Sequence, residues 1–149
     1  MSTYTETVGN KLNDLLEKTY DAEKGYKKAA ENVEHSGLKS FFTRKANERY
    51  NFGHDLKGEI KSFGQEVDKG GSIKGDAHRA WMDVKSLFSS DNAESMLEEA
   101  IRGEKSALKT YNEVLNETSL PSSTRSLLSN QMATIESELS TIKRLEDLQ

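Results

Sequence analysis

The chain has 149 residues, of which 34% are hydrophobic and 31% are charged, and this is enough for one domain with a single hydrophobic core. It contains no cysteine, so disulfides, thiolate metal sites and thiol nucleophiles are excluded, and only three histidines, His35, His54 and His78, remain for metal or acid–base chemistry. The 21 basic and 25 acidic residues give a net charge of -4, which argues against a nucleic acid bound through a general basic surface.

The hydropathy pattern argues against a membrane protein. The longest apolar runs are only a few residues long, and the first residues, MSTYTETVGNK, have neither the basic start nor the apolar core of a signal peptide. We therefore expect a cytoplasmic protein with no membrane partner.

Two helices joined by a tight turn are predicted for the first part of the chain. Apolar or small side chains recur every three or four residues over 8–33, which predicts a helix over 4–34. The same spacing over 38–63 predicts a second helix over 37–64, antiparallel to the first because the connection is short.

The middle of the chain predicts a long crossover and then two further helices. Glycines interrupt 65–91, and a short periodic stretch among them predicts a short helix over 76–88. A Ser-Ser-Asp-Asn cluster is a capping signal for a third long helix over 92–117, and proline in a first turn predicts a fourth over 121–147. The chain is therefore predicted to be one all-α domain over 1–149, a ferritin-like four-helix bundle with a short fifth helix in the crossover between helices two and three.

An internal repeat draws attention to two glutamates. When the first and third long helices are aligned, Glu23-Lys24 falls on Glu104-Lys105, which predicts that Glu23 and Glu104 face each other at similar heights inside the bundle. An unpaired carboxylate there would be costly. Arg49 on helix two and Gln131 at the centre of helix four are the residues expected to hydrogen-bond the two carboxylates and fix the helix register.

A metal site is the alternative role for these glutamates. Bundles with two bridged metal ions use a Glu-x-x-His pair on two helices, and that motif is absent from this sequence. An all-oxygen site for iron or manganese would instead combine Glu23 and Glu104 with Glu48 or Glu138. Such a protein would be a degenerate di-metal oxidase or a metal-storage protein. The favoured interpretation has no cofactor and no catalytic residues.

A second candidate surface lies in the crossover. His78, Arg79 and Trp81 are close enough in sequence to form a ligand or partner contact. The competing interpretation is that Trp81 is the aromatic anchor that docks the short helix on the bundle.

Several segments resemble a family of bacterial ferritin-like four-helix-bundle proteins known as a domain of unknown function. The most specific is GSIKGDAHRAWMDVK over 71–85, followed by Arg102-Gly103-Glu104, with support from 21–26 and from Leu120-Pro121. The resemblance covers residues 12–147.

The resemblance implies a ferritin-like fold, a cytoplasmic location in bacteria, an association with stress and a homodimer, but no established activity. Family members often carry a His-Asp pair near the middle of the last helix, where this chain has Leu139-Ser140. Together, the residues and the resemblance predict a non-enzymatic, stress-associated protein that acts by binding or assembly.

Overall fold

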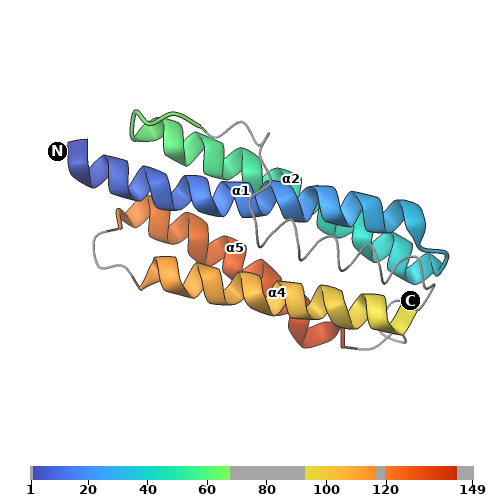
Figure 1. Ribbon diagram of the computed structural model, residues 1–149. Helices are drawn as coiled ribbons and strands as arrows, with labels where there is room; N and C mark the ends of the chain where they lie inside the picture. The colour runs from blue at the N-terminus through green and yellow to red at the C-terminus, as the bar shows by residue number, and fades with distance from the viewer. Residues whose placement is uncertain (1, 68–92, 117–119, 144–149) are drawn as a thin grey trace.

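The structure is a computed structural model that describes residues 2–67, 93–116 and 120–143, with side chains from residue 6 onward. These residues form helices and no strand, which confirms the all-α prediction for the described part of the chain. The helices are α1 (Ser2–Asn32), α2 (Ser36–Ser62), α4 (Ala93–Leu115) and α5 (Ser122–Thr141) (Figure 1).

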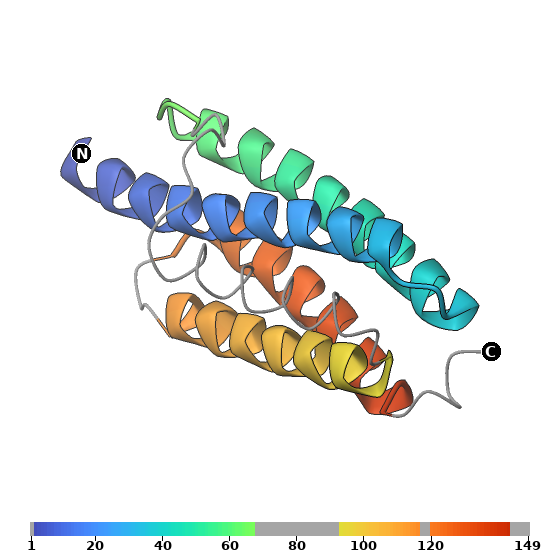
Figure 2. The same ribbon diagram turned by 45° about the vertical axis from the view of Figure 1, so that its right-hand side comes forward.

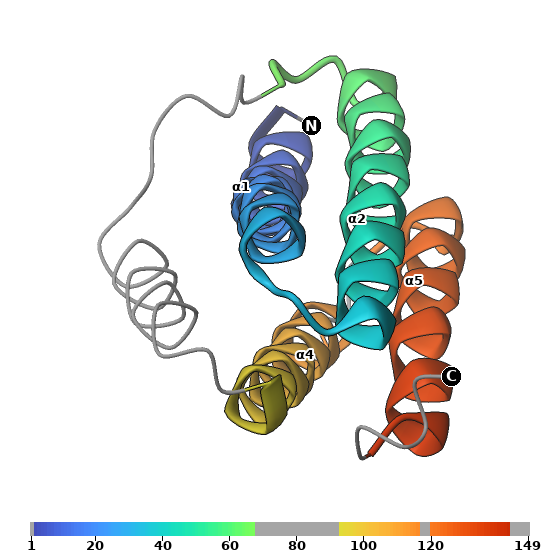
Figure 3. The same ribbon diagram turned by 90° about the vertical axis from the view of Figure 1, so that its right-hand side faces the viewer.

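The helices form two antiparallel hairpins, α1 with α2 and α4 with α5, that lie against each other (Figures 1 and 2). The end-on view in Figure 3 shows α2 beside α5, and α4 next to α1. Close backbone contacts are concentrated within the two hairpins, with a few between α2 and α5, whereas α1 and α4 approach each other less closely. This described part of the chain is therefore a four-helix bundle in which the contact between α1 and α4 is the loosest side.

Local signals explain where α2 begins and ends. His35 is the N-cap residue, and its Nδ1 accepts a hydrogen bond from the Leu38 N–H at 3.1 Å. After the helix ends at Ser62, Gly64 adopts φ +72, a left-handed conformation that glycine adopts without steric cost. At the other end of α2, only three residues separate Asn32 of α1 from Ser36, which confirms the predicted tight turn between the first two helices.

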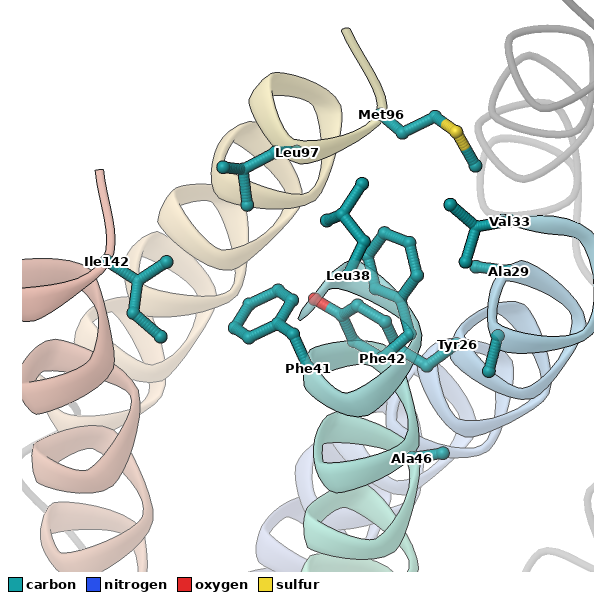
Figure 4. Packing of buried hydrophobic residues seen from close by; sticks show 11 residues of the cluster. Tyr26, Ala29, Val33, Leu38, Phe41, Phe42, Ala46, Met96, Leu97 and Ile142 are labelled. Atoms are coloured by element: carbon teal, nitrogen blue, oxygen red, sulfur yellow. The ribbon is translucent and has the colours of Figure 1, made fainter. Parts of the chain in front are cut away.

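The hydrophobic core is divided into two clusters along the bundle. The turn-end cluster lies near the α1–α2 connection and is shown in Figure 4; its main members are Tyr26, Ala29, Val33, Leu38, Phe41, Phe42, Ala46, Met96, Leu97 and Ile142. The far-end cluster consists of Val8, Leu12, Leu15, Leu16, Phe52, Leu56, Ile60, Tyr111, Leu120, Leu128 and Ile135. Several buried polar side chains belong to neither cluster, including Lys45, Arg49 and Glu104.

The predicted helix bounds differ from the observed ones mainly at the end of α5. The prediction of a helix over 121–147 is wrong there, because the helix ends at Thr141 and Ile142 is an extended cap residue with φ -111 and ψ 101. The hydroxyls of Ser140 and Thr141 both donate to the Ser137 carbonyl. Such side-chain bonds compete with the helical ladder, and β-branched residues favour helices weakly.

The predicted crossover helix over 76–88 lies outside the described residues. Among the helices that are described, none combines the length and the apolar character needed to cross a membrane.

Candidate functional site

A cluster of charged side chains lies in the interior of the bundle. We call Tyr26, Lys45, Glu48, Arg49 and Glu104 the charge network. Lys45 is 0% exposed, and Arg49 and Glu104 are 4% and 3% exposed, so three charged groups are removed from water. Buried charges require partners, and the network supplies them from three different helices.

Glu104 of α4 connects the two hairpins. Its Oε1 accepts a hydrogen bond from Arg49 Nη2 at 2.7 Å and another from the Tyr26 hydroxyl. Its Oε2 lies 3.2 Å from Lys45 Nζ, as an ion pair without hydrogen-bond geometry. One carboxylate of α4 therefore contacts two cations of α2 and a hydroxyl of α1.

Glu48 completes the network on α2. Its Oε2 accepts from Lys45 Nζ at 2.7 Å and from Arg49 Nη1 at 2.6 Å. Lys45 and Arg49 are four residues apart and Glu48 lies between them, so all three side chains project from nearby positions on the helix surface. Two cations face two carboxylates, and the formal charge of the network is zero.

Aromatic rings support the Arg49 guanidinium. Its central carbon lies 5.5 Å from the centre of the Phe52 ring and 5.9 Å from that of Tyr26. A guanidinium over an aromatic face gains a favourable cation–π interaction while it is shielded from water. The orientation of Arg49 is thus fixed by two rings as well as by two carboxylates.

The pKa values of Glu104 and Arg49 favour their charged forms, and the pKa of Tyr26 favours its neutral form. Burial alone would raise the pKa of Glu104, but Arg49, Lys45 and the two hydrogen bonds to its carboxylate outweigh burial and lower it. Burial likewise opposes the charged form of Arg49, and Glu104 is the main cause that nonetheless raises its pKa. Burial, reinforced by Glu104, raises the pKa of Tyr26, so this hydroxyl remains a donor.

A separate polar contact links α4 to α5. The Tyr111 hydroxyl donates to Gln131 Oε1 at 2.6 Å, and Gln131 Nε2 donates to the Phe52 carbonyl at 3.3 Å. Burial raises the pKa of Tyr111, which keeps its hydroxyl protonated. Gln131 thus hydrogen-bonds a tyrosine and the backbone of α2, and this corrects the expectation that it hydrogen-bonds the two central glutamates.

Glu23 does not take part in the charge network. Its Oε2 pairs with Lys27 Nζ at 3.0 Å, one turn along α1, and its side chain is 15% exposed. The structure brings Glu104 and Arg49 together, and the expected pairing of Glu23 with Arg49 or Gln131 is wrong. The rotation of α1 about its axis explains this, because it directs Tyr26 rather than Glu23 at Glu104.

Lys45 and Tyr26 are network residues that the sequence did not identify as site residues. A signal for Lys45 was present, since it falls on the apolar stripe between Phe42 and Arg49 and has an acidic residue three positions later. Tyr26 carried no comparable signal, because a tyrosine on an apolar stripe is an ordinary core residue.

Within the described part of the chain, the carboxylates proposed as ligands do not fit a metal centre. In the ranges that the structure describes, no three His, Asp or Glu side chains gather to hold a metal ion, so the proposed trio of Glu23, Glu48 and Glu104 is not assembled. Glu48 and Glu104 already contact Lys45 and Arg49, which occupy the space beside their oxygens. Glu138, the other proposed oxygen ligand, pairs with Arg44 at 3.3 Å on the outside of the bundle.

The second candidate surface lies in the undescribed crossover. His78, Arg79 and Trp81 are outside the described residues.

A cavity of about 510 Å³ lies between α1 and α4, on the loosest side of the bundle. Tyr26, Arg49, Glu104 and Tyr111 form part of its lining, so the charge network borders it. Its apolar lining includes Leu15, Ala22, Ala29, Phe42, Met96 and Ala100. We call this cavity the α1–α4 groove.

Comparison with known proteins gives a family but no activity. No curated protein matches the chain. A family model described as a domain of unknown function, DUF2383, matches residues 7–117. The matched range covers α2, α4 and most of α1, and it contains all five residues of the charge network, whereas α5 lies beyond it. The chain belongs to the family of unknown function DUF2383.

Proposed function

We propose that the protein is a non-enzymatic, ferritin-like bundle protein that acts by binding or assembly. The single observation that carries the proposal is the neutralised charge network, in which Lys45 and Arg49 stand beside the carboxylates of Glu48 and Glu104. In ferritin-like di-metal proteins, glutamates that project into the centre of the bundle ligate the metal ions. In this chain they stabilise the packing of the two hairpins.

The electrostatic balance supports this proposal over the metal-binding alternative. A divalent ion at Glu48 and Glu104 would have to displace two cations, and both cations would then be buried without a partner. No imidazole is available among the network residues to offset that cost. The resemblance to ferritin-like proteins further supports a bacterial, cytoplasmic, stress-associated homodimer.

Metal analysis of chelator-free protein tests the proposal. We expect well under one equivalent of iron or manganese per chain, and no catalytic oxidation when Fe(II) is added in air. Stoichiometric metal that is lost in Glu23→Ala and in Glu104→Ala would overturn the proposal and establish the carboxylate metal site. Glu31→Ala is the matched control, since Glu31 is an exposed glutamate of the same helix as Glu23.

The assembly part of the proposal is tested by sedimentation velocity. We expect twice the monomer mass at micromolar concentration. A monomer at all concentrations would contradict the homodimer and leave the metal question to the experiment above.

A further inference from the structure

The chain that follows α2 lies against α1. Asn13 Nδ2 donates a hydrogen bond to the Glu66 carbonyl at 2.9 Å. Gly9, one turn earlier on α1, packs so closely against Gln65 that an added Cβ would lie 2.6 Å from the Gln65 Cγ. Val67 packs against the far-end cluster. The chain therefore enters the crossover along α1, at the far end of the bundle.

Gly9 and Asn13 begin a row of residues on α1, spaced four apart, that continues with Glu17 and Asp21. We call these four residues the α1 row. Residues spaced four apart form a ridge that turns by about 40° around the helix at each step. Glu17 and Asp21 are 7% and 5% exposed in the single chain, so a part of the same chain covers them.

The helices α2 and α4 meet α1 on other sides. At Gly53 of α2, an added Cβ would lie 3.6 Å from Leu16 and 3.8 Å from both Thr19 and Tyr20, none of which belongs to the α1 row. α4 faces α1 across the groove, and only Asp21 of the row lines it. α5 lies beside α2, away from α1 (Figure 3). These described helices therefore leave the α1 row to the crossover.

The charges of the crossover complement the α1 row. Buried carboxylates such as Glu17 and Asp21 require cations or N–H donors as partners. We call residues 68–92 the crossover segment, and it contains four basic residues. They are Lys69, Lys74, Arg79 and Lys85.

The length of the crossover segment fits a path along this side of the bundle. The segment ends where α4 begins, at Ala93, which packs against the turn-end cluster. Asn13 and Ala29 mark the levels of its two ends on α1, about 24 Å apart at 1.5 Å per residue. The helix predicted over 76–88 would extend about 20 Å of this distance, and the flanking residues supply the rest.

The predicted crossover helix has an apolar side that suits the α1–α4 groove. Its apolar residues recur at steps of three and four and so project from one side of a helix. They are Ala77, Trp81, Val84 and Phe88. The groove has an apolar lining with small side chains on both walls, such as Ala22 on α1 and Ala100 on α4. Large aromatic side chains pack well against walls of this kind.

We propose that the crossover segment packs along the α1 row, with its basic residues beside Glu17 and Asp21, and directs Trp81 and the apolar side of its helix at the α1–α4 groove. The crossover helix then packs where α1 and α4 approach each other less closely. Trp81 is an anchor within the chain and does not form a ligand surface. The proposal goes beyond the proposed function, because it holds whether or not the protein binds a further partner.

Site-specific quenching of Trp81 tests the location. Trp81 is the only tryptophan and the chain has no cysteine, so a nitroxide can be attached to one introduced cysteine. Gly103→Cys places it in the groove lining, and Gly58→Cys on α2 is the matched control. Both glycines are exposed, and a Cβ added at either meets no described atom within 4 Å. The nitroxide at 103 should quench most of the Trp81 emission, reversibly on reduction with ascorbate, whereas that at 58 should quench little.

A charge reversal tests the contact with the α1 row. Asp21→Lys should repel the basic residues of the crossover segment, so that Trp81 emission shifts to the red and acrylamide quenches it more strongly. Asp14→Lys, at an exposed carboxylate of the same helix, is the matched control and should change neither. Circular dichroism checks that the helices are retained, and Asp21→Asn repeats the test without the reversed charge if Asp21→Lys unfolds.

The proposal is overturned if wild-type Trp81 emits as it does in urea, if the two nitroxide positions quench alike, or if the Asp21 and Asp14 variants behave alike. Quenching that appears only as the protein concentration rises would assign the groove to the crossover of a second copy and would also overturn it. None of these measurements involves a metal, so metal analysis tests the proposed function separately.

Discussion

At the scale of single residues, Glu104 determines how the centre of the bundle is held together. It is the one buried acidic residue among those of α4, and it contacts Arg49 and Lys45 on α2 and Tyr26 on α1. When one member of a buried ion pair is removed, the other remains charged and desolvated. The free-energy cost of that unpaired charge is larger than the net stabilisation that the intact pair provides. We therefore expect the network to contribute more to the specificity of helix packing than to net stability.

Acid should reduce the advantage of the wild type over Glu104→Gln. At pH 7 the variant leaves two buried cations short of a counter-charge, and we expect a loss of about 3 kcal/mol in the free energy of unfolding. The folded state lowers the pKa of Glu104 from 4.5, so its contribution is complete above that pH and declines as the pH falls through the lower folded-state pKa.

Urea denaturation of both proteins at pH 7, 5, 4 and 3 measures this difference. The gap between wild type and variant should be constant from pH 7 to 5 and narrow below about 4.5. A gap that stays constant down to pH 3 would show that Glu104 is not the titrating group.

At the scale of helices, α5 is attached to α2 through its first turn. Pro121 is the N-cap residue and makes no side-chain capping bond. Glu59 Oε2 of α2 instead accepts hydrogen bonds from the Ser123 hydroxyl at 2.8 Å and the Thr124 hydroxyl at 2.6 Å. A carboxylate near a helix N-terminus also interacts favourably with the helix dipole. Glu59 of α2 thus provides, at the first turn of α5, part of the stabilisation that a capping side chain of α5 itself would provide.

Glu59→Ala should destabilise the protein by about 1–2 kcal/mol, because two hydrogen bonds and a favourable charge are lost. Thermal or urea unfolding measures the change. Glu31→Ala, at an exposed site of α1, is the control and should stay within about 0.5 kcal/mol of wild type. If both variants lose the same stability, Glu59 has no specific role at α5.

At the scale of the whole molecule, packing is uneven between the two hairpins. Most of the close backbone contacts lie between α1 and α2, and fewer lie between α4 and α5. The largest fully buried apolar side chains follow the same pattern, with Leu12, Leu16, Leu38, Phe42, Leu56 and Ile60 on the first hairpin and Met96, Leu97, Leu128 and Ile135 on the second. Segments with fewer buried contacts open at lower free energy.

Native-state hydrogen exchange should therefore be slowest in α1 and α2. The amides around Leu16 and Leu56 should open only with global unfolding, whereas those of α4 and α5 should exchange through a smaller opening. Exchange at low concentrations of denaturant, followed by mass spectrometry of peptides, measures both. Equal protection in all four helices would mean that the two hairpins unfold as one cooperative unit.

The helices themselves were predictable because their signals are local. A stripe of apolar residues with a period of three to four, a turn at His35 and Pro121 at a helix start are all properties of neighbouring residues. The end of α5 was predicted too late, since the hydroxyls of Ser140 and Thr141 compete with the helix while the apolar periodicity continues.

The site was predictable only in part. Glu104 and Arg49 were identified because a charge on an apolar stripe needs a partner, and the structure places them 2.7 Å apart. Glu23 has the same local pattern as Glu104, but its partner is Lys27 on its own helix. Lys45 of α2 and Tyr26 of α1 also contact Glu104. Both contacts join residues that are far apart in the sequence, so the local pattern did not reveal them.

The sequence by itself determined the all-α class, the position of each described helix and the shortage of imidazole ligands. Only the tertiary structure decided which of two similar glutamates is buried, which cations meet it and where the bundle leaves a groove. The physical reason is that periodicity fixes which face of a helix is buried, whereas the partner of a buried charge depends on the rotation and spacing of helices that are distant in sequence.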